Sequence, residues 1–359
     1  MKVLISAPDL DRPGGVASYH KTLKPYLGCE VEYFVVGARA GERGLLRRMM
    51  RLMSDYVRFA HRVRSQTCDL VCLNPSLLPN AVVRDGMFLR LAKAAGKKVM
   101  VFFHGWDKGY EQTLRGARLR WFRSLYARGD AFWVNAEEYR DCLRRFGLRA
   151  PVYVETHTVD DREFPPQAPS RRRDPDEPFH ILFLARIESA KGIYQTLDAF
   201  AGLQRNYPAA TLTVAGDGGE LAAAKQYASQ HGIGSVTFTG YLRGEAKQEA
   251  FERAHCYLFP TMHGEGMPHS VLEAMAHGLP VITRPMGGLR DFFEHERMGF
   301  LTSSTAPETF AALLERLIAD PALCAAMGHY NWQYARERFA ASRVAERLEG
   351  IFRSLRRAA

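Results

Sequence analysis

Two acidic side chains, Glu265 and Glu273, lie in a setting that suits a phosphate-bearing ligand. Pro268 fits the first turn of a helix and Gly278 fits the position just after its end, so a short helix is predicted between them. The first backbone N–H groups of such a helix can bind an anion. Glu265 would precede the helix and Glu273 would lie about two turns along it. The two carboxylates could therefore accept hydrogen bonds from sugar hydroxyls on either side of a phosphate.

Two basic side chains, Arg186 and Lys191, follow a predicted strand in the second half of the chain. Arginine can bind two phosphate oxygens in a fork, and lysine supplies a compact charge. At the carboxyl edge of a sheet the pair would suit a diphosphate, although solvated surface cations are the alternative. Loss of either should leave the charge on a departing pyrophosphate unstabilised, at a cost on the order of 3 kcal/mol in transition-state binding.

Glycine turns and a histidine also follow predicted strands. Gly14 and Gly15 would open a helix, where backbone can approach a phosphate closely, although a plain turn is the default for two glycines. Gly216 lies in a similar turn of the second half. His104 ends a predicted strand, where a lone histidine is more often structural than catalytic.

Strands and helices alternate twice along the chain, which predicts two mostly parallel α/β sheets with helices on both faces. A linker rich in proline and charge, residues 161–178, separates a first domain, 1–160, from a second, 179–339. The strands expected in the first domain are 3–6, 31–36, 70–73, 99–103, 131–134 and 152–154. The strands expected in the second are 181–185, 211–215, 236–238, 256–259 and 280–282. A ligand site is expected where such strands end.

The composition is that of a soluble globular protein. The 359 residues are 47% hydrophobic and 25% charged, which argues against disorder. No apolar run approaches the roughly 20 residues that span a bilayer, and the start reads as a strand and not as a signal peptide. Six cysteines without a Cys-x-x-Cys pair predict free thiols in a reducing cytoplasm.

The excess positive charge lies in the first half. Residues 1–170 hold 28 basic and 18 acidic side chains, whereas residues 171–359 hold 21 of each. Such a field attracts nucleic acid, an anionic membrane or a phosphate-bearing substrate. No nucleic-acid-binding motif accompanies the charge, so specific nucleic acid is not expected.

Residues 45–64 predict an amphipathic helix that could lie on an anionic membrane surface. Its apolar positions 45, 46, 49, 53, 56, 57, 60 and 63 share one side, and Met50, Leu52 and Phe59 would widen that side as exposed residues. A second basic and aromatic run, 115–128, includes Trp121, Phe122 and Tyr126. Packing of the first helix on its own sheet, with the arginines in solvent, is an equally weighted alternative.

Together these motifs resemble the retaining, nucleotide-sugar-dependent glycosyltransferases of family 4. The resemblance is carried by the paired glutamates with Gly-x-Pro between them, by the segment from Glu273 to Ile282, and by Arg-x-x-x-x-Lys-Gly at Arg186. It implies the GT-B fold: two Rossmann-like domains facing each other across a deep cleft, with a C-terminal helix, about 340–359, crossing back to the first domain. The first domain would bind the acceptor and the second the donor.

The resemblance also implies roles for single residues. Glu265 would contact the donor sugar, Glu273 the ribose, and His104 the transferred sugar. Arg186 and Lys191 would bind the diphosphate. The other donor-binding residues implied in this way are Gly14, Gly15, Gly216, Tyr241, Leu242, Gly266 and Met267. Two departures from the family are Ala185 in place of a glycine, and Glu155–Asp160 in place of Pro-Asn-Gly-Val-Asp.

The implied reaction moves a hexose from a UDP-, GDP- or ADP-sugar to a hydroxyl acceptor with retention of anomeric configuration, without a metal or other cofactor. No side chain stands out as a nucleophile, so leaving-group stabilisation by Arg186 and Lys191 with front-face attack is the predicted mechanism. The acceptor is expected to be a lipid-linked or phosphorylated glycan of bacterial surface polysaccharide, handled at the inner face of the membrane. The alternative is a catalytically silent sugar-nucleotide-binding partner of another transferase.

Overall fold

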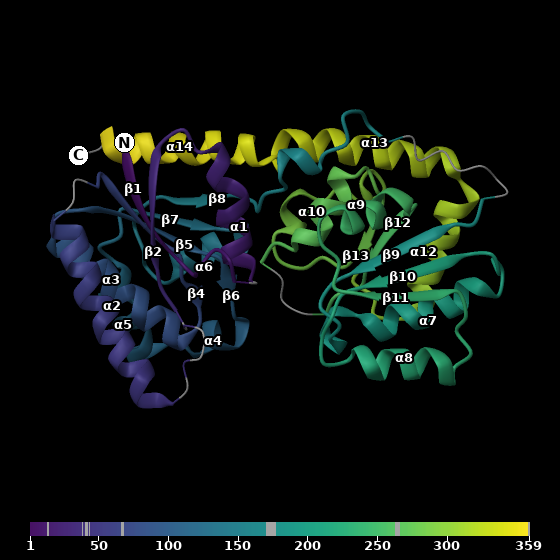
Figure 1. The fold of residues 1–359 in the computed structure, drawn as a ribbon, viewed down its shortest axis with the longest axis horizontal. Coiled ribbons are helices and arrows are strands. Elements are labelled where there is room, and N and C mark those ends of the chain that lie inside the picture. The colour runs from purple at the N-terminus through teal and green to yellow at the C-terminus, as the bar shows by residue number, and fades with distance from the viewer. Residues whose placement is uncertain are drawn as a thin grey trace. The chain divides into compact units, whose positions relative to one another are not determined.

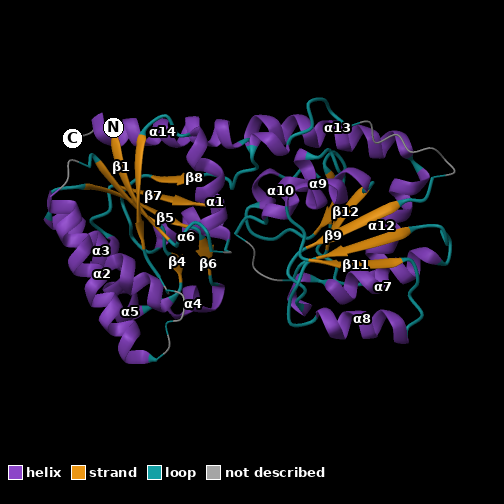
Figure 2. Cartoon of the chain, in the orientation of Figure 1, coloured by secondary structure: helices purple, strands orange, loops and turns teal. Residues whose placement is uncertain are grey.

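The computed structural model describes residues 1–12, 14–37, 39, 42, 44–65, 68–169, 177–262 and 266–357. These residues form two compact units. The first comprises Met1–Thr158, the last helix of the chain, and Gly266 with Met267. The second comprises the remaining described residues from Val159 to Ala340. Each unit is built on one six-stranded parallel sheet (Figures 1 and 2).

The first sheet has the strand order β2-β1-β3-β5-β7-β8. Its strands are β1 (Lys2–Ala7), β2 (Glu30–Val35), β3 (Leu70–Leu73), β5 (Lys98–Phe103), β7 (Ala131–Val134) and β8 (Val152–Val154). Two short strands, β4 (Ser76–Leu77) and β6 (Gly105–Trp106), pair separately beyond β3 and β5. The predicted strands are confirmed to within one residue at each end. β1, β3, β5 and β7 are largely buried apolar runs, whereas β2 and β8, at the two edges of the sheet, are only partly buried.

Alternating side chains of these strands fill two separate cores. Leu70 and Cys72 of β3 join the core beneath α1 and the last helix, whereas Val71 and Leu73 join the core on the opposite face. This is the two-residue period of a strand buried on both faces. The helices of the first unit are α1 (Gly15–Leu23), α2 (Leu45–Ser65), α3 (Pro79–Ala94), α4 (Lys108–Thr113), α5 (Gly116–Tyr126) and α6 (Glu137–Arg145), with η1 (Lys24–Tyr26) following α1.

The last helix, α14 (Ala341–Arg357), packs on the first unit as the GT-B resemblance implies (Figure 1). Its inward side chains recur at helical spacing, with Val344, Leu348, Ile351 and Leu355 in the core shared with α1. The ion pair between Arg347 and Glu155, with Nε–Oε1 at 2.9 Å, ties the helix to the end of β8.

The second sheet has the order β11-β10-β9-β12-β13-β14, which is the Rossmann order. Its strands are β9 (His180–Leu184), β10 (Thr211–Ala215), β11 (Val236–Gly240), β12 (Cys256–Phe259), β13 (Val281–Thr283) and β14 (Gly299–Leu301). The accompanying helices are η2 (Asp161–Glu163), η3 (Ser189–Lys191), α7 (Ile193–Gln204), α8 (Leu221–Gln230), α9 (Gly244–Arg253), α10 (His269–Ala276), α11 (Leu289–Phe292), α12 (Pro307–Ala319) and α13 (Pro321–Arg338). The chain reverses its direction of progress across the sheet between β9 and β12, so this is where a ligand site is expected.

The prediction of which side chains of α2 are exposed is wrong in part. Phe59, expected to be exposed, is fully buried together with Val63, and so is Asp55. Asp55 accepts hydrogen bonds from Arg39 and Arg51, at 3.2 and 3.0 Å, and also pairs with Arg58. A buried carboxylate held by arginines is compatible with a core-facing position, which hydrophobic periodicity does not detect. In the second basic run Phe122 and Tyr126 are also buried, contrary to a surface role.

Candidate active site

Lys191 lies at the point where the second sheet reverses. It ends η3, directly after β9 and its loop, and its side chain is buried, with 7% of its surface exposed. The next residue, Gly192, has φ +84°, and a Cβ there would lie 2.5 Å from the carbonyl oxygen of Pro260, just beyond β12. Only glycine lets the two strand ends meet this closely. The backbone therefore brings the Lys191 ammonium to the edge where ligands of open α/β sheets bind.

Arg186 lies in the same loop but in a different environment. Its side chain is 67% exposed and its Nη1 lies 2.7 Å from Oε1 of Glu188. An exposed ion pair of this kind contributes little to stability, so an anionic ligand can replace Glu188 at small cost. The predicted cation pair thus consists of one buried and one exposed side chain on a single loop.

Gly216 directly follows β10, beside this loop. A Cβ at Gly216 would lie 1.8 Å from the carbonyl oxygen of Ala185, a distance no side chain tolerates. The amide of Ile187 also donates to the carbonyl of Asp217 at 3.0 Å. The two loops are therefore locked together, and the predicted donor contact at Gly216 coincides with a strict packing requirement.

Helix α10 begins at His269, after Pro268, and ends just before His277 and Gly278, as predicted. The hydroxyl of Tyr257 donates to the Leu184 carbonyl at 2.8 Å and lies 2.6 Å from Oγ of Ser270, which fixes α10 to the end of β9. Glu273 lies about one turn into this helix, not two. Gly266 and buried Met267 precede it, whereas Glu265 lies outside the described residues.

Glu273 forms an ion pair that the sequence did not predict. Nζ of Lys247, on α9, lies 2.8 Å from Oε1 of Glu273 and 2.9 Å from Oε2 of Glu163, in η2. The three side chains are 17–25% exposed. Burial lowers the pKa of Lys247, but the two carboxylates raise it by more, so the net shift is upward from 10.5. Sequence spacing gave no signal for this cluster, because its members come from three separate elements.

Tyr241 and Leu242, the predicted base contacts, follow β11. The ring of Tyr241 is 65% exposed and lies beneath the guanidinium of Arg243, with 4.8 Å between Cζ and the ring centroid. An exposed aromatic face is available for stacking.

In the first unit, polar residues follow four neighbouring strands at one sheet edge. Asn74 follows β3, His104 follows β5, Asn135 follows β7, and His157 lies three residues beyond β8. All four are buried. Asn74 bridges to β1, where its Nδ2 donates to the Ser6 carbonyl at 2.8 Å, so it marks the point where this sheet reverses. Sequence analysis found only His104. Asn74 and Asn135 were detectable as polar residues directly following apolar strands, whereas His157, three residues beyond β8, had no such signal.

The ring of His104 is tightly enclosed. Its Nε2 lies 2.8 Å from Oδ1 of Asn74, and its ring centroid lies 3.5 Å from that of Phe102 and 5.0 Å from that of Tyr19. Asn135 donates from Nδ2 to the His104 carbonyl at 3.2 Å and lies 3.1 Å from Nε2 of His157. The histidine is therefore held in one orientation by side chains from two adjacent strands.

Gly14 and Gly15 lie at the N-terminus of α1, after β1, as predicted. A Cβ on either would meet no atom within 4 Å. Both glycines are exposed, and their position at a helix N-terminus is where an anionic ligand can bind.

Helix α2 carries an exposed apolar surface. Six large side chains on it are 56–74% exposed: Leu45, Leu46, Met49, Met50, Met53 and Val57. Positions 45, 49, 53 and 57 recur every four residues, so these side chains form a stripe along one side. We call these six residues the α2 stripe. An exposed patch of this kind typically marks an interaction surface.

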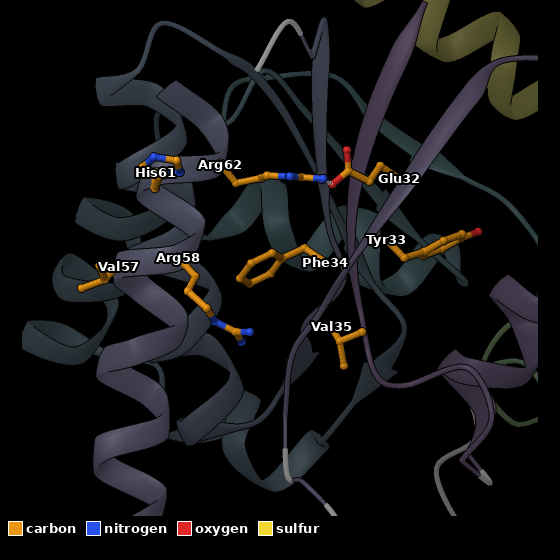
Figure 3. Close-up of a pocket in the computed structure, with 8 residues that line it drawn as sticks. All are labelled: Glu32, Tyr33, Phe34, Val35, Val57, Arg58, His61 and Arg62. Atoms are coloured by element: carbon orange, nitrogen blue, oxygen red, sulfur yellow. Dashed lines mark hydrogen bonds and ion pairs between the residues drawn. The ribbon is translucent and has the colours of Figure 1, made fainter. Parts of the chain in front are cut away.

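A cavity of about 600 Å³ lies between α2 and the edge strand β2 (Figure 3). Its residues are Glu32, Tyr33, Phe34, Val35, Val57, Arg58, His61 and Arg62. Arg62 reaches across it to pair with Glu32, and the Arg58 guanidinium lies 5.7 Å from the ring centroid of Phe34. None of the predicted donor-binding residues lines this cavity.

All six cysteines are free, as predicted, and five of them are buried. Within the described ranges, no group of three or more His, Cys, Asp or Glu side chains is placed to hold a metal ion. No described helix is long and apolar enough to cross a bilayer.

Comparison with known proteins agrees with this architecture. Residues 166–334 match the model of the family described as glycosyl transferases group 1. The chain is 29% identical over 174 residues to glycogen synthase of Mycobacterium tuberculosis, but spans only 41% of that protein. It is 29% identical over 281 residues, 72% of each chain, to the GDP-mannose-dependent α-(1-6)-phosphatidylinositol monomannoside mannosyltransferase of Mycolicibacterium smegmatis.

Among solved structures, HepE of Anabaena in complex with UDP aligns with 99% of this chain and 100% of its own. The TM-score is 0.78 at 18% identity, a likeness of fold. Residues 166–334 therefore resemble the glycosyl transferases group 1 family, and the chain that carries them has the GT-B fold.

Proposed function

We propose that this protein is a retaining, family 4 glycosyltransferase. It moves a hexose from a nucleoside-diphosphate sugar to a hydroxyl of a lipid-linked or phosphorylated glycan during assembly of bacterial surface polysaccharide. The observation that carries this proposal is buried Lys191 at the reversal point of the second sheet, on the same loop as Arg186. A buried cation beside an exposed one suits a diphosphate better than a neutral ligand.

In the proposed reaction the bond between the sugar C1 and the phosphate oxygen breaks as the acceptor oxygen bonds to C1 from the same face. The acceptor's proton leaves with the departing phosphate. Lys191 and Arg186 stabilise the negative charge that grows on that phosphate, and Glu273 binds the ribose. Electrostatic stabilisation of this kind is often the largest contribution to catalysis. His104, Glu265 and the amides of Gly266 and Met267 are proposed to hold the sugar.

The nature of the acceptor is supported by the mycobacterial mannosyltransferase relative, whose name states a phosphatidylinositol monomannoside. The nucleotide is proposed to be UDP, GDP or ADP, since UDP occurs in the complex of the structural neighbour and GDP-mannose in the name of the relative. A metal is not required in this proposal, because the two cations take the role of charge neutralisation. Full activity in excess chelator is the expected result.

A thermal-shift panel of UDP-, GDP- and ADP-sugars identifies the donor, because a ligand that binds only the folded state raises the melting temperature. NMR of the product's anomeric proton then tests retention. Donor hydrolysis by the wild type but not by Glu265→Ala supports an enzyme. Donor binding without hydrolysis or transfer to any glycan acceptor would instead favour a silent sugar-nucleotide-binding partner.

We further propose that the protein works at the cytoplasmic face of the membrane, held there by the α2 stripe. Arg47 and Arg48 are exposed beside the stripe, and Asp55, the acidic residue of α2, is buried. An apolar stripe flanked by cations suits an anionic bilayer surface. Exposed Arg118 and Trp121 of α5 would add to the contact.

Co-sedimentation with vesicles of phosphatidylglycerol and phosphatidylcholine tests the membrane proposal. The wild type should bind at low salt, and the variant Leu46→Gln/Met49→Gln/Met53→Gln should not. Val83→Gln, at an exposed position of the neighbouring helix α3, serves as the control and should bind like the wild type. Equal binding by the triple variant would contradict the role of the stripe.

A further inference from the structure

Every N–H donor of the Lys247 ammonium forms a hydrogen bond with a carboxylate. Its Nζ lies 3.1 and 2.9 Å from the two carboxylate oxygens of Glu163, and 2.8 Å from Oε1 of Glu273. A lysine has three N–H donors, so these contacts use all of them. Among the described residues, Oε2 of Glu273 has no hydrogen-bond partner. Lys247 therefore fixes one oxygen of Glu273 and leaves the other to accept bonds.

Three different elements supply this cluster, which makes its geometry rigid. Glu273 is on α10, Lys247 is on α9, and Glu163 ends η2. Glu163 accepts from Lys247 with both carboxylate oxygens, and Glu273 accepts with one. Charge-assisted bonds of 2.7–2.9 Å are the stronger class of hydrogen bond. A carboxylate held in this way has little rotational freedom to lose when a ligand binds.

The charges in the cluster also depend on Lys247. Two largely buried carboxylates share one cation, and burial together with the charge of Glu273 raises the pKa of Glu163. Without the ammonium, both carboxylates would remain close together with no charge to balance them. Like charges this close repel each other, so Glu273 would lose the orientation that its bond to Lys247 gives it.

We propose that Lys247 is a positioning residue for nucleotide recognition. It holds Glu273 turned so that Oε2 accepts from the ribose hydroxyls, while Glu163 accepts from the other two donors of Lys247. This inference rests on the proposed function, because a ribose reaches Glu273 only if the donor is a nucleoside-diphosphate sugar. Lys247 itself does not touch the ligand.

Calorimetric binding of matched nucleotides tests the proposal. UDP, GDP and ADP are titrated first, and the one that binds the wild type is compared with its 2′,3′-dideoxy form. The wild type should bind the ribose form at least about tenfold more tightly, the effect of one charge-assisted hydrogen bond. Lys247→Met should bind both forms within about twofold of each other. A general loss of stability would weaken both forms alike and leave the ratio unchanged.

Two further variants serve as controls. Glu163→Gln should keep the preference for ribose, because the glutamine oxygen can still accept from Lys247, which remains paired with Glu273. Lys225→Met, at an exposed position on α8, is the control and should match the wild type. If Lys247→Met does not fold, Lys247→Gln replaces it, since glutamine keeps polar character without the charge.

The outcomes separate the two proposals. If none of the three nucleotides binds the wild type, the proposed function fails. If the wild type prefers the ribose form and the Lys247 variant keeps that preference, only the role of Lys247 is overturned. It is also overturned if the wild type binds both forms equally, or if Glu163→Gln loses the preference as completely as Lys247→Met.

Discussion

Oδ1 of Asn74 lies 2.8 Å from Nε2 of His104 at the edge of the first sheet. Because Nδ2 of the same amide donates to the Ser6 carbonyl, Oδ1 must act as the acceptor toward His104. Nε2 of His104 therefore carries a hydrogen. A residue at the reversal point of the sheet thus sets both the orientation and the tautomer of the histidine that is proposed to contact the sugar.

Replacing Asn74 with leucine should lower both stability and activity. The change removes a partner of His104 and of the Ser6 carbonyl, so the free energy of unfolding should fall by about 1–3 kcal/mol. Chemical denaturation measures this. Asn206→Leu, at an exposed site, should cost no more than about 0.5 kcal/mol. Equal costs for the two variants would contradict the bridging role of Asn74.

Lys191→Met should reduce kcat/KM for the donor by about a hundredfold or more, because the departing diphosphate loses a buried cation. Arg186→Met should have a smaller effect, since the Arg186 side chain is largely exposed and its interaction with a ligand is screened by solvent. Steady-state kinetics on the donor identified by thermal shift gives both values. The reverse ranking would show that Arg186 carries the main charge.

Gly192→Ala should be strongly destabilising. The new Cβ would be placed 2.5 Å from the Pro260 carbonyl oxygen, on a backbone with φ +84°. The expected loss is about 3 kcal/mol or more. Gly232→Ala is the matched control, because it has φ +63° but open space, and its cost should be about 1–2 kcal/mol from the backbone alone. Thermal denaturation of the two variants separates crowding from backbone strain.

His20 should make the protein less stable in mild acid. Burial lowers the pKa of His20 from 6.5 to about 4. Between those values the unfolded chain binds a proton that the folded protein does not, so the free energy of unfolding falls as pH drops from about 6.5 to 4. The whole effect is on the order of 3 kcal/mol. Urea denaturation of His20→Asn should show a shallower pH dependence than the wild type, whereas exposed His231→Asn should not.

Most of the strands were predictable because they are short apolar runs, several of them followed by glycine or a polar residue. β14, Gly299–Leu301, was missed because it begins with glycine, a poor strand former, and so offers only two apolar residues. The Glu273 helix was found because Pro268 and Gly278 mark both of its ends. These signals lie within short stretches of the chain, so they can be recognised from a single sequence.

Features that depend on distant parts of the chain were not predictable. The buried position of Asp55 depends on arginines that surround it in space, so the periodicity of α2 pointed to the wrong face. In the sequence, Lys247 is one of several charged residues on a polar helix. Only the positions of α10 and η2 show that it pairs with Glu273 and Glu163. His157 occupies a segment where the family resemblance fails, and its contact with Asn135 requires the neighbouring strand.

The central claim is that the carboxyl edge of the second sheet holds the diphosphate and ribose of a sugar donor. A crystal structure with the bound donor measures this most directly. The claim predicts Nζ of Lys191 within about 3 Å of a phosphate oxygen and the Glu273 carboxylate at a similar distance from a ribose hydroxyl. A donor bound with both side chains remote from it, or bound to the first unit alone, would contradict the claim.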